Sequence, residues 1–297
     1  MAQTLALFLL RRNEGDRIGR IRDYAGRLKC GNGTVQAAFS LLEECGAIET
    51  EARGHLGTYL VRADISLLWK VAGLGAVTAA MPMPSGLQSE GLATGLRRAF
   101  QQSGIPLNLT FIQGSHSRVN ALVDRRLDLI AMSRLAFDRS SQELPIKLMG
   151  DLGTQTYTGK YCILLRRDAS LDSTGLRVAI DPRSMDQEVI CRQVFARKRV
   201  EYIYASYPLM NKLFERGDLD ATVWHGEDAP RRFSRDLKVF PVSRDIMDDL
   251  PKELSRAALA VYQQNSEPVS AVCHRISLDW IIKSQAEVIS GQLVPSY

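Results

Sequence analysis

The stretch CGNGTVQAAFSLLEECGAI, residues 30–48, begins with two glycines one residue apart and continues with an apolar pattern of helical period. Apolar residues at i, i+3, i+4 and i+7 share one face of a helix, and this spacing holds for Val35, Ala38, Phe39 and Leu42. The preceding segment repeats it in Ile21, Tyr24, Ala25 and Leu28. Two amphipathic helices are therefore predicted, joined by the turn KCGNG, residues 29–33, whose glycines can take positive φ.

The segments on both sides of these helices extend the pattern. A further helix is predicted over about residues 4–11, whose leucines offer apolar contacts to the same small core. Gly46 is predicted to end the helix. Residues 47–62 then alternate in polarity, and residues 53–57 interrupt the alternation, which is typical of a hairpin with a basic tip. Three helices and a hairpin predict an α+β winged helix-turn-helix domain over residues 1–62.

The two glycines and Thr34 also resemble a phosphate-binding loop when they are read alone. A Walker loop has a lysine before its Ser or Thr, a dinucleotide-binding loop has a third glycine, and both follow a strand. Here the preceding segment is helical, and the sequence has neither that lysine nor the third glycine. The pattern favours a winged helix over a nucleotide-binding loop. A helical module that binds no nucleic acid is the other alternative.

A winged helix places the second helix of its helix-turn-helix unit in the DNA major groove, while the wing contacts the backbone or the minor groove. Between Arg11 and Lys29 lie seven basic and three acidic residues, so this span carries four of the five net positive charges. Such a run is also compatible with a solvated helical face. The residues predicted to contact double-stranded DNA are Arg27, Lys29, Asn32, Thr34, Gln36, Arg53 and His55.

The composition is that of a globular chain, with 297 residues, of which 45% are hydrophobic and 24% charged. Five cysteines lack the spacing of a metal site or a disulfide framework, so we expect a reducing compartment, no metal and no cofactor. The N-terminal segment fails as a secretory signal because its arginines follow the apolar run. Prolines and glycines interrupt residues 71–97. We expect a cytoplasmic protein that does not engage a membrane.

Beyond a linker predicted at residues 63–75, strands and helices alternate in two copies of one plan. Each copy predicts a β-α-β-α-β unit and ends in a similar segment, with Leu127-Asp128 in the first and Leu219-Asp220 in the second. Residues 76–297 are therefore predicted to form an α/β two-lobed domain of the type II periplasmic-binding-protein fold. Lobe I is expected at about residues 76–133 plus a C-terminal segment, and lobe II at about residues 134–250.

Two facing lobes form a cleft that a small-molecule effector closes by hinge motion. Several strand ends precede helices, whose N–H groups favour anions, so we expect a small polar ligand, with an acidic group as a candidate. The alternative is that serines at these positions simply cap helices. The predicted ligand-binding residues follow the strands: Ser85, Gln88, Gly114, Ser115, His116, Ser133, Arg134, Asp181, Ser184, Asp186, Ser206 and Trp224.

The chain resembles the YhfZ-type regulators, which carry a GntR-like winged helix and a YhfZ-type C-terminal domain. The matching pieces span nearly the whole chain: TVQAAFSLLEECGAI, RGHLGTYLV, AMPMP with EGLATGL, MSRLA, DPRSMDQ and VISGQLVPSY. The resemblance implies a bacterial cytoplasmic transcription factor. Where GntR proteins usually have Ser-Arg-Thr, this chain has Gly31-Asn32-Gly33, which removes an expected arginine contact to DNA.

These parts together predict a ligand-responsive DNA-binding regulator, acting as a homodimer because a palindromic operator calls for two recognition helices. A binding protein for transport is a second possibility, against which the winged helix argues. An enzyme is a third, with reactive groups at His116, Asp181, Asp186, Cys191, His225 and Asp228. We predict that the chain is not an enzyme, because the sequence has no G-x-S-x-G or H-E-x-x-H motif and Cys191 lies in an apolar helical stretch.

Overall fold

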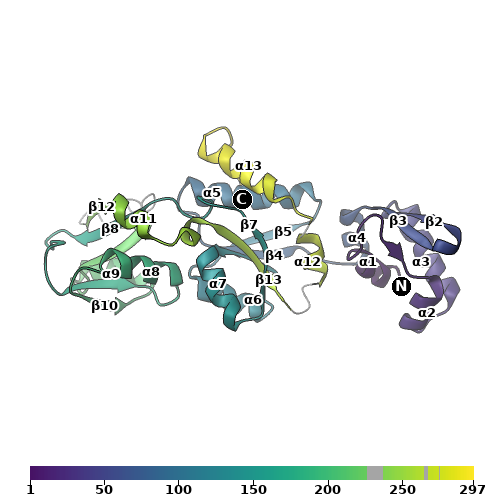
Figure 1. The fold of residues 1–297 in the computed structure, drawn as a ribbon, viewed down its shortest axis with the longest axis horizontal. Coiled ribbons are helices and arrows are strands. Elements are labelled where there is room, and N and C mark those ends of the chain that lie inside the picture. The colour runs from purple at the N-terminus through teal and green to yellow at the C-terminus, as the bar shows by residue number, and fades with distance from the viewer. Residues whose placement is uncertain (226–236, 264–266, 274) are drawn as a thin grey trace. The chain divides into compact units, whose positions relative to one another are not determined.

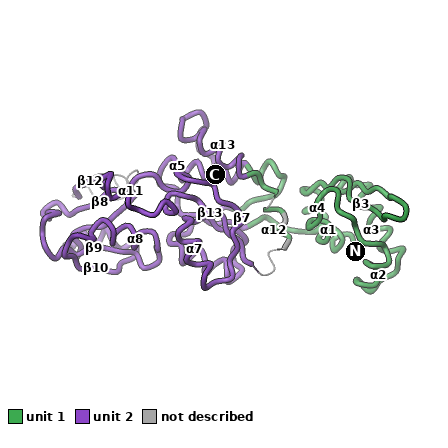
Figure 2. Tube along the Cα trace, viewed as in Figure 1, with its two compact units in different colours: residues 1–77, 99–108, 264–277 green, residues 78–98, 109–263, 278–297 purple. Residues whose placement is uncertain are grey.

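The computed structural model describes residues 1–225, 237–263, 267–273 and 275–297. They divide into two compact units (Figure 2), the first made of residues 1–77, 99–108 and 264–277, and the second of residues 78–98, 109–263 and 278–297. Asp228, one of the reactive groups considered above, lies outside the described residues. The division into residues 1–62, 63–75 and 76–297 stays a prediction.

The first unit contains the winged helix-turn-helix (Figure 1). Its elements are α1 Ala2–Leu9, β1 Arg17–Ile18, α2 Ile21–Leu28, α3 Asn32–Glu44, β2 Ile48–Ala52 and β3 Thr58–Ala63. The strands form an antiparallel sheet in the order β1-β3-β2. The four residues of the predicted apolar face of α3, Val35, Ala38, Phe39 and Leu42, are buried, and the ring of Phe39 packs edge-on against Tyr24 of α2. This packing confirms the two amphipathic helices that the apolar spacing predicts.

The turn between α2 and α3 differs from the prediction in one respect. The left-handed residue is Lys29, with φ of 52°, whereas Gly31 is the extended N-cap of α3 and Gly33 lies in its first turn. Lys29 is left-handed because its N–H bonds back to the carbonyls of Ala25 and Gly26, which ends α2.

The predicted linker at residues 63–75 contains a helix, α4 Ile65–Val71. Asp64 caps its N-terminus by accepting a hydrogen bond from the N–H of Leu67, and the side chains of Leu68 and Trp69 are buried. The indole N–H of Trp69 donates to the carbonyl of Gly75. This segment is therefore an ordered, packed part of the first unit and not an extended connection.

The second unit holds two five-stranded sheets with equivalent strand orders, β5-β4-β6-β13-β7 in lobe I and β10-β9-β11-β8-β12 in lobe II (Figure 1). In lobe I the strands are β4 Val77–Met81, β5 Leu107–Phe111, β6 Leu129–Ser133, β7 Ile146–Asp151 and β13 Ala257–Tyr262. In lobe II they are β8 Tyr161–Arg166, β9 Leu176–Ile180, β10 Val200–Tyr204, β11 Ala221–His225 and β12 Leu237–Pro241.

The repeated Leu-Asp pair has the same role in both lobes. Asp128 accepts a hydrogen bond from the N–H of Thr78 at 2.8 Å, and its own N–H donates to the Thr78 carbonyl. Asp220 does the same with Arg177, where the N–H bond to the carboxylate is 2.9 Å. In each lobe the pair thus ties the start of the third strand of the copy to the start of the first.

The helices of lobe I are α5 Leu87–Gln102, α6 Ser115–Val123, α7 Arg134–Glu143 and α13 Leu278–Ile289. In Figure 1, α6 and α7 lie on one side of the sheet and α5 and α13 on the other. Gly91 and Gly95 of α5 let α13 approach closely, because a Cβ at Gly95 would lie 2.6 Å from the Ile281 carbonyl oxygen. This contact explains the two glycines of the motif EGLATGL.

The predicted boundary between the lobes, at residue 134, is wrong. Helix α7 and strand β7 belong to lobe I, because β7 pairs with β13, which itself pairs with β6. Strand β13 returns from far along the chain and inserts between its neighbours. The chain crosses into lobe II after β7 and comes back to lobe I before β13.

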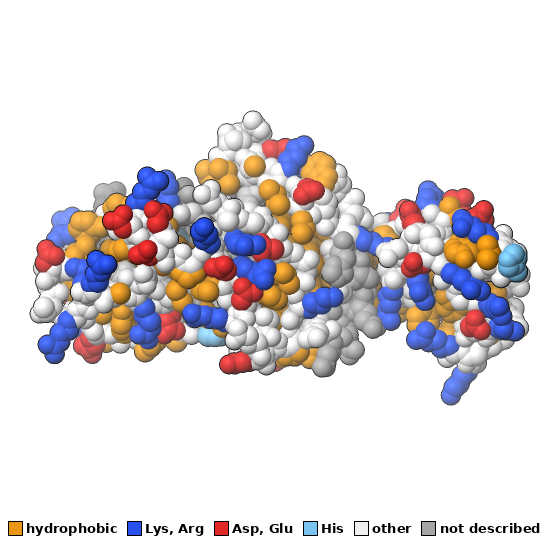
Figure 3. Space-filling view, viewed as in Figure 1, with side chains coloured by type: hydrophobic (Ala, Val, Ile, Leu, Met, Phe, Trp, Pro, Cys, Tyr) orange, Lys and Arg blue, Asp and Glu red, His pale blue; other side chains and the backbone are white. Residues whose placement is uncertain are grey.

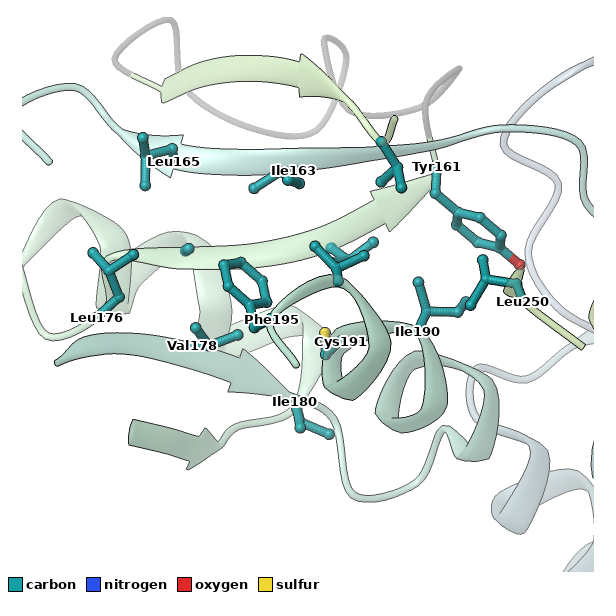
Figure 4. Packing of buried hydrophobic residues seen from close by; sticks show 14 of the residues in the cluster. Tyr161, Ile163, Leu165, Leu176, Val178, Ile180, Ile190, Cys191, Phe195 and Leu250 are labelled. Carbon is teal, nitrogen blue, oxygen red and sulfur yellow. The ribbon is translucent and has the colours of Figure 1, made fainter. Parts of the chain in front are cut away.

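Helices α8 Met185–Val194, α9 Tyr207–Glu215 and α11 Arg244–Asp249 complete lobe II. Figure 4 shows the core between α8 and the sheet, where Cys191 lies beside Phe195 and Val178. The Cys191 thiol is fully buried, and burial raises its pKa to about 12. The prediction that Cys191 is a core residue is confirmed.

Candidate functional site

The outer face of α3 carries the residues predicted to read DNA. Asn32, Thr34 and Gln36 are all exposed, because the apolar residues between them turn inward. Small residues, among them Gly33 and Ala37, are exposed beside them, whereas Glu43 and Glu44 are exposed at the C-terminal end of α3. The N-terminal half of the helix therefore presents the polar side chains of Asn32, Thr34 and Gln36, which suit contacts with base edges.

Basic residues surround this face. Figure 3 shows Lys and Arg side chains gathered on the visible side of the winged-helix unit. Arg53 on the wing is held by Glu51 at 2.6 Å and lies over the Tyr59 ring, 4.6 Å from its centroid. Arg27 lies over the Phe8 ring, and Lys29 and His55 are exposed. These positions suit contacts with phosphate groups.

A cavity lies between the lobes, within the second unit, and opens to solvent. We call it the lobe cavity. Residues from strand ends and helix starts of both lobes line it, as the prediction required. Seven of the predicted ligand-binding residues are among them: Ser85, Gln88, Gly114, Ser115, Ser184, Asp186 and Trp224.

Five predicted residues lie outside the lining: His116, Ser133, Arg134, Asp181 and Ser206. Ser206 is the N-cap of α9, and a His116 ring nitrogen lies 3.2 Å from the Pro182 carbonyl. Arg134 pairs with Asp138 and Asp151 of its own lobe.

Asp181 has a structural role and does not face the lobe cavity. Its carboxylate is fully buried and accepts hydrogen bonds from the guanidinium of Arg183 and from the N–H of Tyr207. Burial by itself raises the pKa of Asp181, but these hydrogen bonds outweigh it and lower the pKa. The carboxylate therefore stays charged and ties the strand end to α9.

Arg118 is the residue of the lobe cavity that the sequence analysis missed. Its side chain is 2% exposed, and its guanidinium donates to the carbonyls of Ala131 at 3.0 Å and Ile112 at 2.7 Å and to the Tyr157 hydroxyl at 3.1 Å. A signal was present, since Ser115, Arg118, Val119 and Leu122 have the i, i+3, i+4, i+7 spacing of the buried face of α6. The prediction considered only residues that directly follow a strand, and Arg118 lies inside α6.

Aromatic side chains form much of the remaining wall. Tyr157 and Tyr161 come from the connection after β7 and the start of β8, and Tyr207 packs edge-on against Trp224, with ring centroids 4.6 Å apart. Burial raises the pKa of Tyr157 to about 12, so its hydroxyl keeps its proton and can donate a hydrogen bond.

Asp186, in the first turn of α8, is the acidic group of the lobe cavity. The Ser133 hydroxyl of lobe I donates to its Oδ1 at 2.6 Å, so this bond joins the two lobes. Burial raises the pKa of Asp186 to about 6, against the opposing effects of the Ser133 bond and of the positive charges of Arg118 and Arg139.

The lobes also touch through the backbone beside the cavity. The N–H of His116 donates to the Arg183 carbonyl, and the N–H of Met185 to the Ser115 hydroxyl at 3.5 Å. Gly114 is left-handed, with φ of 84°, and a Cβ there would lie 2.7 Å from that of Arg183. The lobes are therefore closed upon each other at this edge of the cavity.

The described residues contain no cluster of three or more His, Cys, Asp or Glu side chains arranged to hold a metal ion. Among their helices, none combines the length and the apolar composition needed to cross a membrane.

The winged helix and the two lobes define a class of protein, in which a helix-turn-helix domain is joined to a domain with the fold of periplasmic binding proteins. The aliphatic sulphonate binding protein SsuA of Escherichia coli shares this second fold, with a TM-score of 0.51 and 13% identity over 73% of this chain and 75% of that one. Residues 64–297 match the YhfZ C-terminal domain, and residues 13–60 match a helix-turn-helix domain. The chain belongs to the YhfZ family.

Two relatives support this assignment. The uncharacterized protein YhfZ of Escherichia coli K12 is 30% identical over 296 residues, which cover 99% of this chain and 95% of the relative. The crystal structure of YhfZ from Shigella flexneri has a TM-score of 0.58 and 26% identity, covering 79% of this chain and 98% of that one.

Proposed function

We propose that this chain is a bacterial transcription regulator that binds operator DNA through its winged helix and senses a small polar metabolite in the lobe cavity. The observation that supports it best is the combination of both parts in one chain: an exposed recognition helix flanked by basic residues, and a cavity between two lobes that is lined by the buried Arg118. Arg118 and the N-termini of α6 and α8 favour an anionic group on the metabolite.

The regulator would act in the cytoplasm as a homodimer. Two copies of α3 are needed to read two half-sites of a palindromic operator, about one turn of DNA apart. We propose a binding protein and not an enzyme. Hydrogen bonds to groups of lobe I hold the side chains of Arg118 and Asp186 in place, and this arrangement suits the binding of a ligand between the lobes.

A mobility-shift assay with the full-length protein tests DNA binding. Genomic fragments, including the region upstream of the protein's own gene, are compared with random DNA of equal length at several salt concentrations. We expect one or more fragments to bind preferentially, with an affinity that falls steeply as salt rises, because Lys and Arg contacts release counterions from DNA. Equal, weak binding to all fragments would refute the proposal.

A further inference from the structure

The acidic side chain that lines the lobe cavity, Asp186, and the buried basic one, Arg118, come from different lobes, and the exposed Lys160 lines the cavity as well. Arg118 lies on α6 of lobe I and Asp186 on α8 of lobe II. Arg118 and Asp186 form no direct ion pair within 4.0 Å with each other or with another described residue. The positive charge of Arg118 lowers the pKa of Asp186 although no ion pair joins the two side chains, so each keeps hydrogen-bonding groups that a ligand between them can use.

The positive side chain is positioned in advance. Three of the five guanidinium N–H groups of Arg118 are used by the carbonyls of Ala131 and Ile112 and by the Tyr157 hydroxyl. Two N–H groups therefore remain without an acceptor among the described residues. Tyr157, which accepts from Arg118, still has its own O–H to donate. A carboxylate fits this set of donors because it accepts two parallel N–H bonds and a third from a hydroxyl.

The negative side chain is similarly held on one side. Oδ1 of Asp186 accepts the Ser133 bond, and Oδ2 has no hydrogen bond to the described residues. A protonated amino group supplies both a positive charge and N–H donors for that oxygen. It would also favour the ionised form of a carboxyl whose pKa burial raises.

We propose that the effector is a small zwitterion, whose carboxylate binds Arg118 and Tyr157 of lobe I and whose protonated amino group binds Asp186 of lobe II. The proposal rests on the ligand-sensing function proposed above and names the class of ligand. Such a molecule would connect the lobes by pairing both charges at once. The aromatic walls at Tyr161, Tyr207 and Trp224 would surround the remainder of the molecule.

Thermal-shift measurements and calorimetric titration of the full-length protein test the proposal. The probes are the proteinogenic amino acids in L and D forms, and for each one the acid lacking the amino group and the amine lacking the carboxylate. Sugars, dicarboxylates and inorganic phosphate complete the panel. We expect at least one amino acid to stabilise the protein and to bind about 10- to 100-fold more tightly than both of its matched analogues.

The Asp186→Asn variant separates recognition from folding. Its amide can still accept the Ser133 bond, so we expect the ratio of the Kd values of the amino acid and its desamino analogue to approach one. Tyr157→Phe should weaken both compounds, since both carry the carboxylate. Asp172→Asn, at a side chain that is 98% exposed, is the control and should change neither Kd.

The outcomes are distinct. Equal Kd values for amino acids and their desamino analogues in the wild-type protein would overturn the zwitterion, as would the failure of every amino acid to stabilise it. Binding of a sugar, a dicarboxylate or phosphate instead would also overturn it, while the ligand-sensing function would stand. Failure of DNA binding in the mobility-shift assay would affect the regulator proposal and leave the ligand class intact.

Discussion

At the scale of single residues, Lys29 has a left-handed backbone conformation, which is unfavourable for a residue with a side chain. This conformation costs a non-glycine residue about 1–2 kcal/mol. Substitution by glycine removes the cost, but part of the gain is lost because glycine increases the entropy of the unfolded chain. We expect Lys29→Gly to raise the free energy of unfolding of the winged helix by about 0.5–1 kcal/mol, measured by chemical denaturation. Gly46→Ala, at φ of 73°, is the matched control and should lower it.

A second residue-scale prediction concerns pH. The pKa of Asp186 is raised to about 6 in the folded protein, above the value of about 4 in the unfolded chain. The folded state therefore binds the proton more tightly, and the free energy of unfolding falls as pH rises through this window. Asp186→Asn removes that titration, so its stability relative to wild type should rise between about pH 4 and pH 7, by on the order of 1–3 kcal/mol.

Denaturant titrations at several pH values measure this difference. Asp172→Asn provides the baseline, because that side chain is fully open to water. A constant difference between Asp186→Asn and wild type across the pH range would contradict the raised pKa of Asp186.

Residue patterns in the sequence found part of the site. Strand ends followed by helices located Ser115, Ser184 and Asp186, since parallel strands end at one edge of a sheet. Tyr157 has no such pattern: it lies in the connection between lobes, and its place depends on contacts with distant segments. Asp181 and Arg134 satisfied the pattern but are bound by neighbouring charges of their own lobe.

At the scale of elements, local periodicity predicted the helices and the repeated β-α-β-α-β units well. It could not assign α7 and β7 to lobe I, because the partner that holds them there, β13, is more than a hundred residues away along the chain. The contact of α5 with α13 is likewise non-local, although the glycines of EGLATGL mark it in the sequence.

This contact gives an element-scale prediction. Gly95→Ala places a methyl group 2.6 Å from the Ile281 carbonyl, so α13 must move away from α5. We expect a loss of about 1–3 kcal/mol in the free energy of unfolding of the lobes, measured by thermal or chemical denaturation. Gly26→Ala is the control: it lies inside α2 with no other atom within 4 Å of the added Cβ, and should stabilise its helix by up to about 1 kcal/mol.

At the scale of the whole molecule, filling the lobe cavity should separate ligand sensing from DNA binding. Ser184 lines the cavity and accepts a hydrogen bond from the N–H of Gln187 as the N-cap of α8. We expect Ser184→Trp to abolish stabilisation by any ligand that the wild-type protein binds, while ligand-free DNA binding stays unchanged. Ser184→Ala loses the same cap, at about 1 kcal/mol, without filling the cavity, and should keep the ligand response. An unaltered response in Ser184→Trp would place the ligand elsewhere.

The winged helix should divide its DNA contacts between α3 and the wing. Gln36 on α3 can pair with a base edge, so Gln36→Ala should reduce the binding free energy by about 1–3 kcal/mol on a preferred fragment and by little on random DNA.

On the wing, Arg53 must exchange its ion pair with Glu51 for one with a phosphate. Arg53→Ala should therefore weaken binding to both DNAs alike and reduce the slope of log K against log salt by about one. Arg244→Ala, an arginine that is 93% exposed on lobe II and pairs with Asp248, should change neither property in the same mobility-shift titrations. If Arg53→Ala and Arg244→Ala behave alike, the wing does not contact DNA, and α3 must supply the binding by itself.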